Sequence, residues 1–270
     1  MHDWLAVLIL GIVEGITEFL PVSSTGHLLI TEHLLIAAHW MTTGKSDLFN
    51  IVIQCGAVIA VLPLFPQRLY KFVFELGDKQ TQNYLLKVIV AFLITCAGGY
   101  VLDKHKFKLP EELAPVAWAL LLGGIVFLAV EWFVRGKKPA SEITWAVVVA
   151  VGVGQLIAAV FPGASRSGTT IMLSLLLGMG RPAATEFSFL VGIPTMLAAG
   201  GLKIFKGLHH SDPLAPKEDW GMVILATVVA SIVSFIAVKW LLRYVQSHTF
   251  NAFGWYRIVL GIIMLAFLMR

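Results

Sequence analysis

The chain has 270 residues, of which 58% are hydrophobic and only 13% are charged, and its mean hydropathy is +0.84. Because a soluble domain carries roughly 25% charged residues, this composition excludes an ordinary soluble protein and indicates an integral membrane protein. The formal net charge is only +4. The basic residues lie in short connections between apolar runs, so we expect them to contact lipid headgroups and not nucleic acid.

The first predicted element, residues 4–38, is apolar, is interrupted by a polar turn that contains Pro21, and is then apolar again. A membrane-spanning helix needs about 20 mostly apolar residues, and each half of this segment is shorter. We therefore predict a re-entrant helical hairpin, whose two short helices enter and leave the membrane on one side. Irregular backbone at such depth is tolerated only where protein or a water-filled cavity surrounds it.

Two acidic residues lie in the first half of this segment. Glu14 and Glu18 are four residues apart, so they share one face of a helix. Two carboxylates at membrane depth repel each other unless a proton or a cation lies between them. They are candidates to bind a divalent metal through oxygen ligands, or one of them is a general base. The alternative is that both lie near the interface and are solvated.

The turn of the first hairpin is rich in hydroxyl groups. Ser23, Ser24 and Thr25 precede Gly26 and a new apolar run, and a serine or threonine there is the usual N-cap of a helix. A second interpretation takes account of His27 and the nearby acidic pair, because a hydroxyl beside a histidine and a carboxylate is typical of an activated nucleophile. The N-terminus of the following helix also offers N–H groups to an anion.

Three apolar runs follow, at 49–66, 86–102 and 113–134, and we predict that each spans the membrane. The first run is short and contains Gln54. A polar residue in a span either lines a site or pairs with a neighbouring helix.

A second broken segment, residues 143–180, repeats the pattern around Pro162 and predicts a second re-entrant hairpin. Its outgoing helix opens with Arg166, a charged residue at predicted membrane depth, which is a functional candidate by default. A guanidinium group binds phosphate through two parallel hydrogen bonds, and N-terminal amides and hydroxyls add donors. The alternative is an internal ion pair with Glu14 or Glu18, and the two arrangements are compatible in an empty site.

Three more apolar runs, at 185–205, 220–243 and 254–269, complete the chain as predicted spans. The two broken segments align without a gap as far as the serines of their turns, and one inserted residue then restores the alignment. The aligned pairs are Gly11/Gly152, Glu14/Gln155, Pro21/Pro162, Ser24/Ser165 and, after the insertion, Gly26/Gly168.

The order is thus a hairpin and three spans, followed by a hairpin and three spans. Because three is odd, the second half must be inserted upside down, and the two turns then meet near the middle of the bilayer. The predicted fold is an all-α integral membrane protein with six transmembrane helices and two re-entrant hairpins in an inverted-topology repeat. It forms one domain, 1–270, with repeats at about 1–135 and 143–270. Slightly more basic residues lie on the side of Lys137 than on that of Lys45, which makes the former side cytoplasmic.

The residues of the two turns also carry a family resemblance. The stretches 14–27 and 162–170 resemble the two signature motifs of bacterial undecaprenyl-diphosphate phosphatases of the bacitracin-resistance type. The resemblance extends to 49–54, 184–189 and the pair Tyr256-Arg257, and it covers essentially the whole chain.

This resemblance implies hydrolysis of undecaprenyl diphosphate to undecaprenyl phosphate and inorganic phosphate, which recycles the lipid carrier of cell-wall synthesis. It also implies a multi-pass enzyme of the bacterial inner membrane whose site opens to the periplasmic side. The implied cofactor is a divalent cation, Mg²⁺ or Ca²⁺. The implied partners are the lipid diphosphate and membrane lipids, without nucleic acid, and a homodimer is left open.

The resemblance implies roles for individual residues as well. Ser24 is the implied nucleophile and His27 the acid/base, Glu14 and Glu18 bind metal or act as base, and Arg166 holds the diphosphate. The predicted substrate-binding residues are Ser23, Thr25, Gly26, Gln54, Ser165, Ser167, Gly168 and Thr169.

The alternative function is a secondary transporter or lipid flippase with an anion site between inverted repeats, since transporters use broken helices near the midplane. The combination of hydroxyl, histidine and carboxylate argues against it, because transport does not need these groups.

Overall fold

The computed structural model describes residues 3–107, 109–209 and 219–268, and within these ranges the chain is all-helical, with eleven α-helices and one short 3-10 helix, η1. The helices are α1 (Asp3–Thr17), α2 (Ser24–Ala37), α3 (Asp47–Val61), η1 (Leu62–Leu64), α4 (Pro66–Phe74), α5 (Lys79–Lys104), α6 (Leu113–Val134), α7 (Trp145–Val160), α8 (Arg166–Leu176), α9 (Arg181–His209), α10 (Trp220–Tyr244) and α11 (Asn251–Leu268).

Six helical stretches of the described chain are long and apolar enough to cross a membrane, which confirms the predicted spans at the level of length and composition. They are α3 with η1, α5, α6, α10, α11 and the Arg181–Lys206 part of α9. Helix α5 begins seven residues before the predicted apolar run, because the Asp78 carboxylate caps it by accepting a hydrogen bond from the Thr81 N–H at 3.0 Å. This bond and the Thr81 hydroxyl hold the pKa of the Asp78 carboxyl below its usual value.

Each broken segment consists of two short helices joined by an irregular turn, α1 and α2 around residues 18–23 and α7 and α8 around residues 161–165. Both turns end on an N-cap serine with positive φ, 74° at Ser23 and 68° at Ser165. The Ser23 hydroxyl accepts from the Gly26 N–H and the Ser165 hydroxyl from the Gly168 N–H. The structure therefore pairs Ser23, not Ser24, with Ser165. Pro21 and Ser23 are two positions apart, whereas Pro162 and Ser165 are three positions apart, so the extra residue lies within the second turn, before its serine.

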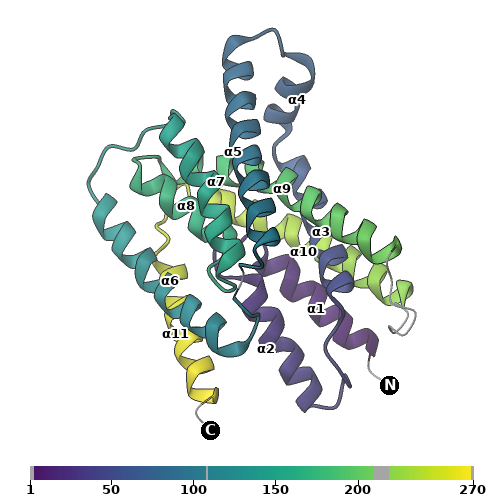
Figure 1. Ribbon diagram of the computed structural model, residues 1–270. Helices are drawn as coiled ribbons and strands as arrows, with labels where there is room; N and C mark the ends of the chain where they lie inside the picture. Colours follow the sequence, from purple (N-terminus) through teal and green to yellow (C-terminus); the bar gives the residue numbers. More distant parts are fainter. Residues whose placement is uncertain (1–2, 108, 210–218, 269–270) are drawn as a thin grey trace.

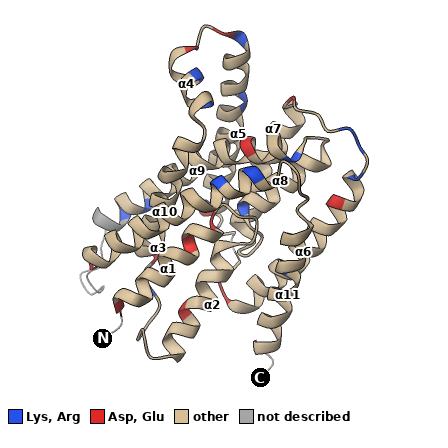
Figure 2. Cartoon of the chain, turned by 180° about the vertical axis from the view of Figure 1, so that it is seen from behind, with Lys and Arg blue, Asp and Glu red and all other residues tan. Residues whose placement is uncertain are grey.

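The first helix of each broken segment packs against a long helix from the other half of the chain. Helix α1 packs against α10, and α7 packs against α5, while α6 and α11 lie side by side along most of their length (Figure 1). Helix α3 contacts α10 and α9. Basic residues gather on α4 and on the connection between α6 and α7, and a small charged group lies in the middle of the molecule near α1 and α8 (Figure 2).

The first turn lies in the hydrophobic core and not at the surface. Phe19, Leu20 and Val22 are buried in one cluster with side chains from several helices, among them Phe127 of α6 and Phe189 of α9. The Ser167 hydroxyl at the start of α8 lies 3.3 Å from the Leu20 carbonyl oxygen, so the second segment meets the first turn directly. Protein thus surrounds this irregular backbone, which is the condition for placing it at the predicted membrane depth.

Candidate active site

The hydroxyl of Ser24, the predicted nucleophile, contacts a buried carboxylate. Ser24 is the first residue of α2, and its Oγ donates a 2.6 Å hydrogen bond to Oε2 of Glu18, which follows α1 directly. The Glu18 side chain is largely buried, with 7% of the residue exposed. A carboxylate within hydrogen-bond reach of a hydroxyl can accept its proton when the oxygen attacks. The predicted nucleophile is therefore paired with one of the two predicted acids.

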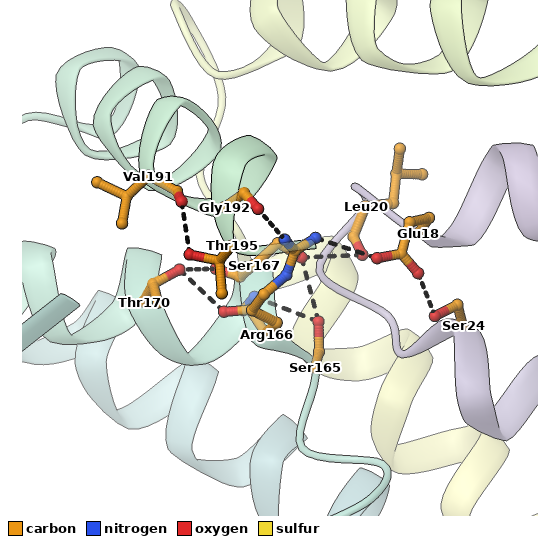
Figure 3. A network of polar contacts seen from close by, with 11 residues as sticks. Glu18, Leu20, Ser24, Ser165, Arg166, Ser167, Thr170, Val191, Gly192 and Thr195 are labelled. Carbon is orange, nitrogen blue, oxygen red and sulfur yellow. Dashed lines mark hydrogen bonds and ion pairs between the residues drawn. The ribbon is translucent and has the colours of Figure 1, made fainter. Parts of the chain in front are cut away.

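Arg166 approaches the same carboxylate from the other segment. Its Nη2 lies 3.0 Å from Glu18 Oε1, and its Nη1 donates to the Gly192 carbonyl oxygen of α9 at 3.1 Å (Figure 3). The predicted ion pair between Arg166 and the acidic pair is present, and its partner is Glu18. Because one oxygen of Glu18 faces the hydroxyl and the other faces the guanidinium, a single carboxylate joins the two halves of the site.

Glu14 lies one helical turn before Glu18 and is only 1% exposed. The alternative of two solvated glutamates near the interface is therefore wrong. Its Oε2 atom is buried without a hydrogen-bond partner among the described residues. One guanidinium faces two buried carboxylates, and an uncompensated buried charge is costly. A proton or a cation beside Glu14 would balance the site.

The protein donors available to a metal are few. Within the described residues, no three histidine, cysteine, aspartate or glutamate side chains lie close enough together to hold an ion. The unpartnered oxygen of Glu14 and the neighbouring Glu18 are oxygen donors of the kind that Mg²⁺ and Ca²⁺ prefer. Two such residues fit a cation that takes its remaining ligands from water and phosphate, as Mg²⁺ commonly does.

His27 does not contact Ser24 through either ring nitrogen. Its Nδ1 lies 2.7 Å from the Ser23 carbonyl oxygen, and its Nε2 lies 2.6 Å from the Tyr256 hydroxyl of α11. Since a carbonyl only accepts, Nδ1 carries the proton in the neutral ring and Nε2 accepts from Tyr256. The two rings are stacked with their planes 5° apart. The predicted acid/base role of His27 stays a prediction, and the residue in contact with Ser24 is Glu18.

A cavity of about 570 Å³ opens beside these groups. Of the predicted residues, it is lined by Glu14, Ser24, Thr25 and Gln54. Its volume is in the range of small-molecule sites. Its apolar part is formed by leucine and isoleucine side chains of α2 and α3 and by Leu109 and Pro110, which precede α6.

Five further polar residues line the cavity and were not predicted: Glu32, Asp47, Asn50, Glu111 and Lys203. A signal for two of them exists in the sequence. Asp47, Asn50 and Gln54 recur at spacings of three and four, which places them on one face of an otherwise apolar helix. A polar stripe of this kind points toward water or a ligand and not toward lipid.

The other predicted binding residues support the turns. Ser23 and Gly26 form the cap of α2, and Ser165 and Gly168 form that of α8. The Thr169 hydroxyl donates to the Ser165 carbonyl oxygen at 2.9 Å. Their hydroxyl groups thus have partners within the protein, so direct contact of these residues with a ligand stays a prediction.

Comparison with known proteins adds the following. The family described as bacitracin resistance protein BacA matches residues 7–263. The chain is 50% identical over 264 residues to an undecaprenyl-diphosphatase of Rhizobium etli, with 97% of this chain and 96% of the relative covered. It is 47% identical over 270 residues to an undecaprenyl-diphosphatase of Xanthomonas oryzae pv. oryzae, with 99% and 98% covered.

Proposed function

The chain belongs to the bacitracin resistance protein BacA family, and we propose that its two serine-capped turns form the active site for the hydrolysis of a lipid diphosphate. The protein is an undecaprenyl-diphosphate phosphatase. It converts undecaprenyl diphosphate to undecaprenyl phosphate and thereby renews the lipid carrier of cell-wall synthesis. The observation that carries the assignment of the site is the 2.6 Å hydrogen bond from the Ser24 hydroxyl to Glu18.

In the first step, Ser24 Oγ attacks the terminal phosphorus of the diphosphate. The Oγ–P bond forms, Glu18 takes the hydroxyl proton, and the bridging P–O bond breaks to release undecaprenyl phosphate. In the second step, water attacks the phosphoserine. The P–Oγ bond breaks, Glu18 returns its proton to Oγ, one water proton goes to solvent, and inorganic phosphate leaves.

Arg166 binds the phosphate oxygens in both steps. Its guanidinium already lies next to the carboxylate that activates Ser24, so a phosphate held by Arg166 is close to the attacking oxygen. The hydrogen bond to the Gly192 carbonyl oxygen holds the side chain in this direction. Positive groups that are fixed before the reaction stabilise the charge that builds up in the transition state.

Glu14 and Glu18 would hold the divalent cation, Mg²⁺ or Ca²⁺, that we propose as cofactor. The buried unpartnered Oε2 of Glu14 supports this assignment. When bound, the cation offsets the negative charge of the diphosphate and of the two carboxylates.

We further propose that the two segments are re-entrant hairpins in an inverted-topology repeat, with halves at about 1–135 and 143–270. Two features support this proposal. The turns share the serine cap with positive φ, and the pairing of α1 with α10 corresponds to that of α7 with α5. The protein is a multi-pass membrane protein, and we place it in the bacterial inner membrane with the cavity open to the periplasm. Its proposed partners are the lipid diphosphate and the surrounding lipids.

Labelling of single cysteines tests this arrangement. In a background without Cys55 and Cys96, Lys45→Cys should react with an impermeant thiol reagent added to intact cells. Lys137→Cys should react only after the membrane is opened. Reaction of both positions from the same side would contradict the inverted repeat.

The active-site proposal is tested by phosphate release from purified protein in detergent, where no gradient can drive transport. We expect release with undecaprenyl diphosphate, and a phosphoserine at Ser24 when the reaction is quenched early and the peptides are analysed by mass spectrometry. A phosphorylated residue other than Ser24 would refute the nucleophile. Hydrolysis without any phosphoenzyme would point to attack by water.

A further inference from the structure

Arg257 is a fully buried arginine that contacts the backbone of both turns. It lies on α11 and is 0% exposed. Its Nη1 donates to the Pro21 carbonyl oxygen of the first turn at 3.3 Å, and its Nη2 donates to the Gly163 carbonyl oxygen of the second turn at 3.1 Å. Nη2 also donates to the Ala119 carbonyl oxygen of α6 at 3.1 Å. One guanidinium group thus ties three separate parts of the chain together.

The charge of Arg257 has no carboxylate partner within the described residues. The partners of its guanidinium are the three carbonyl oxygens and the face of the Phe127 ring, whose centroid lies 5.2 Å away. Its Nε atom is buried and has no hydrogen-bond partner among the residues that the structure describes. Burying a charge without an opposite charge is expensive, so a purely structural role would be better served by an apolar side chain.

A structural arginine elsewhere in the protein shows the contrast. Arg181 on α9 pairs with the buried Glu131 of α6 through Nε at 2.9 Å and through Nη2. Glu131 also accepts a hydrogen bond from the Phe250 N–H at 2.8 Å. This network connects helices as Arg257 does, but its charges are balanced and it does not contact either turn.

We propose that Arg257 is a positioning residue: it holds the turn that carries Ser24 and Glu18 against the turn that leads to Arg166, and so fixes the gap between nucleophile and phosphate site. The proposal rests on the proposed function. The planar guanidinium matters because its two terminal nitrogens reach carbonyl groups in different segments, which the single ammonium of a lysine cannot do in the same geometry. Its unpaired charge also favours an anion between the turns.

Gly123 on α6 supplies the space that the guanidinium needs. A Cβ atom at this position would overlap Nη2 of Arg257. Gly123→Ala therefore displaces the guanidinium without removing its charge. Gly99 on α5 offers a matched control, because a Cβ there has no neighbouring atom within 4 Å.

The experiment compares Arg257→Gln, Arg257→Lys and Gly123→Ala with the controls Arg181→Gln and Gly99→Ala. It measures the melting temperature, kcat per folded molecule and KM for undecaprenyl diphosphate. A displacement of about 1 Å in a site can cost about a hundredfold in rate. We expect kcat to fall about a hundredfold in both Arg257 variants and about tenfold in Gly123→Ala. The controls should keep kcat within about twofold, even where Arg181→Gln lowers the melting temperature.

The results separate positioning from simple stabilisation. Equal losses of melting temperature in Arg257→Gln and Arg181→Gln, with kcat per folded molecule unchanged in both, would overturn the proposal. Normal kcat in Gly123→Ala would also overturn it. If none of the three test variants folds, the role of Arg257 is structural and the proposal falls. Failure of the proposed function appears separately, as a phosphoenzyme that does not form at Ser24 in the unaltered protein.

Discussion

The two turns of this protein have the same backbone form and different chemistry. Each ends on a serine with positive φ that caps the following helix. The next residue is Ser24 in the first turn and Arg166 in the second. The same position, the first residue of a helix that begins in the protein interior, therefore carries the proposed nucleophile in one half and the proposed phosphate-binding cation in the other. A repeated backbone can divide one reaction between its two copies.

The helices that lead into the turns, α1 and α7, also carry different polar residues at corresponding positions. Glu14 of α1 lines the cavity, and one of its carboxylate oxygens has no hydrogen-bond partner in the described part of the chain. At the corresponding place on α7, the Gln155 amide nitrogen donates to the Thr95 hydroxyl of α5 at 2.8 Å. Glu14 of the first segment thus faces the cavity, whereas Gln155 of the second segment contributes to the packing of α7 against α5. The predictions below test this division.

The largest effect should come from the residue that follows the first cap. Ser24→Ala removes the attacking oxygen, so kcat should fall on the order of a thousandfold or more, while lipid binding and folding persist. Phosphate release and equilibrium binding of the lipid check this. Substantial remaining activity would mean that the first turn does not carry the nucleophile.

A smaller but still severe loss should follow a change at the matching position of the second turn. Arg166→Lys keeps the charge but loses the planar pair of donors. We expect it to lose roughly a hundredfold in kcat/KM, nearly as much as Arg166→Ala. Near-normal turnover in the lysine variant would show that only the charge at this position is required.

Exchanging the residues of the incoming helices sharpens the comparison further. Glu14→Gln gives the first copy the residue of the second, and it should raise the cation concentration for half-maximal activity at least about tenfold. The reverse change, Gln155→Glu, is the control and should leave this concentration unaltered. A chelator should abolish phosphate release by both variants. A reduced rate with an unshifted cation titration would identify Glu14 as a group in proton transfer instead.

The smallest effects concern the feature that the turns share. Ser23→Ala and Ser165→Ala each remove a helix cap and should each cost about 1 kcal/mol of stability. Ser165→Gly should cost only a few tenths of a kcal/mol, since glycine accepts the positive φ without strain. Thermal unfolding in detergent measures these differences. A much larger loss at one serine than at the other would show that the two caps are not equivalent.

The spans and the existence of the two broken segments could be predicted from the sequence, because length, hydropathy and a central proline are local properties. The pairing of the two turns was wrong by one residue, since Ser23 and Ser24 are both available to align with Ser165 and only the backbone shows which one is the cap.

Side-chain contacts between distant parts of the chain could not be predicted from the sequence. The His27 ring is hydrogen-bonded to the Tyr256 hydroxyl, although the two residues are 229 positions apart. The motif around His27 does not indicate in which direction its ring points. The same holds for Arg257. The family resemblance includes Arg257 in the pair Tyr256-Arg257, but only the fold shows that its guanidinium reaches both turns.

The bond between Arg166 and Glu18 also bears on how the enzyme is cleared after each cycle. In the proposed reaction, inorganic phosphate leaves the Arg166 guanidinium, for which the carboxylate of Glu18 competes at 3.0 Å. When phosphate departs, the Glu18 carboxylate takes its place beside the guanidinium, and this carboxylate cannot diffuse away because it belongs to the protein. We therefore expect accumulated phosphate to inhibit the enzyme only weakly, and an inhibitor aimed at Arg166 to need tighter binding than Glu18 provides.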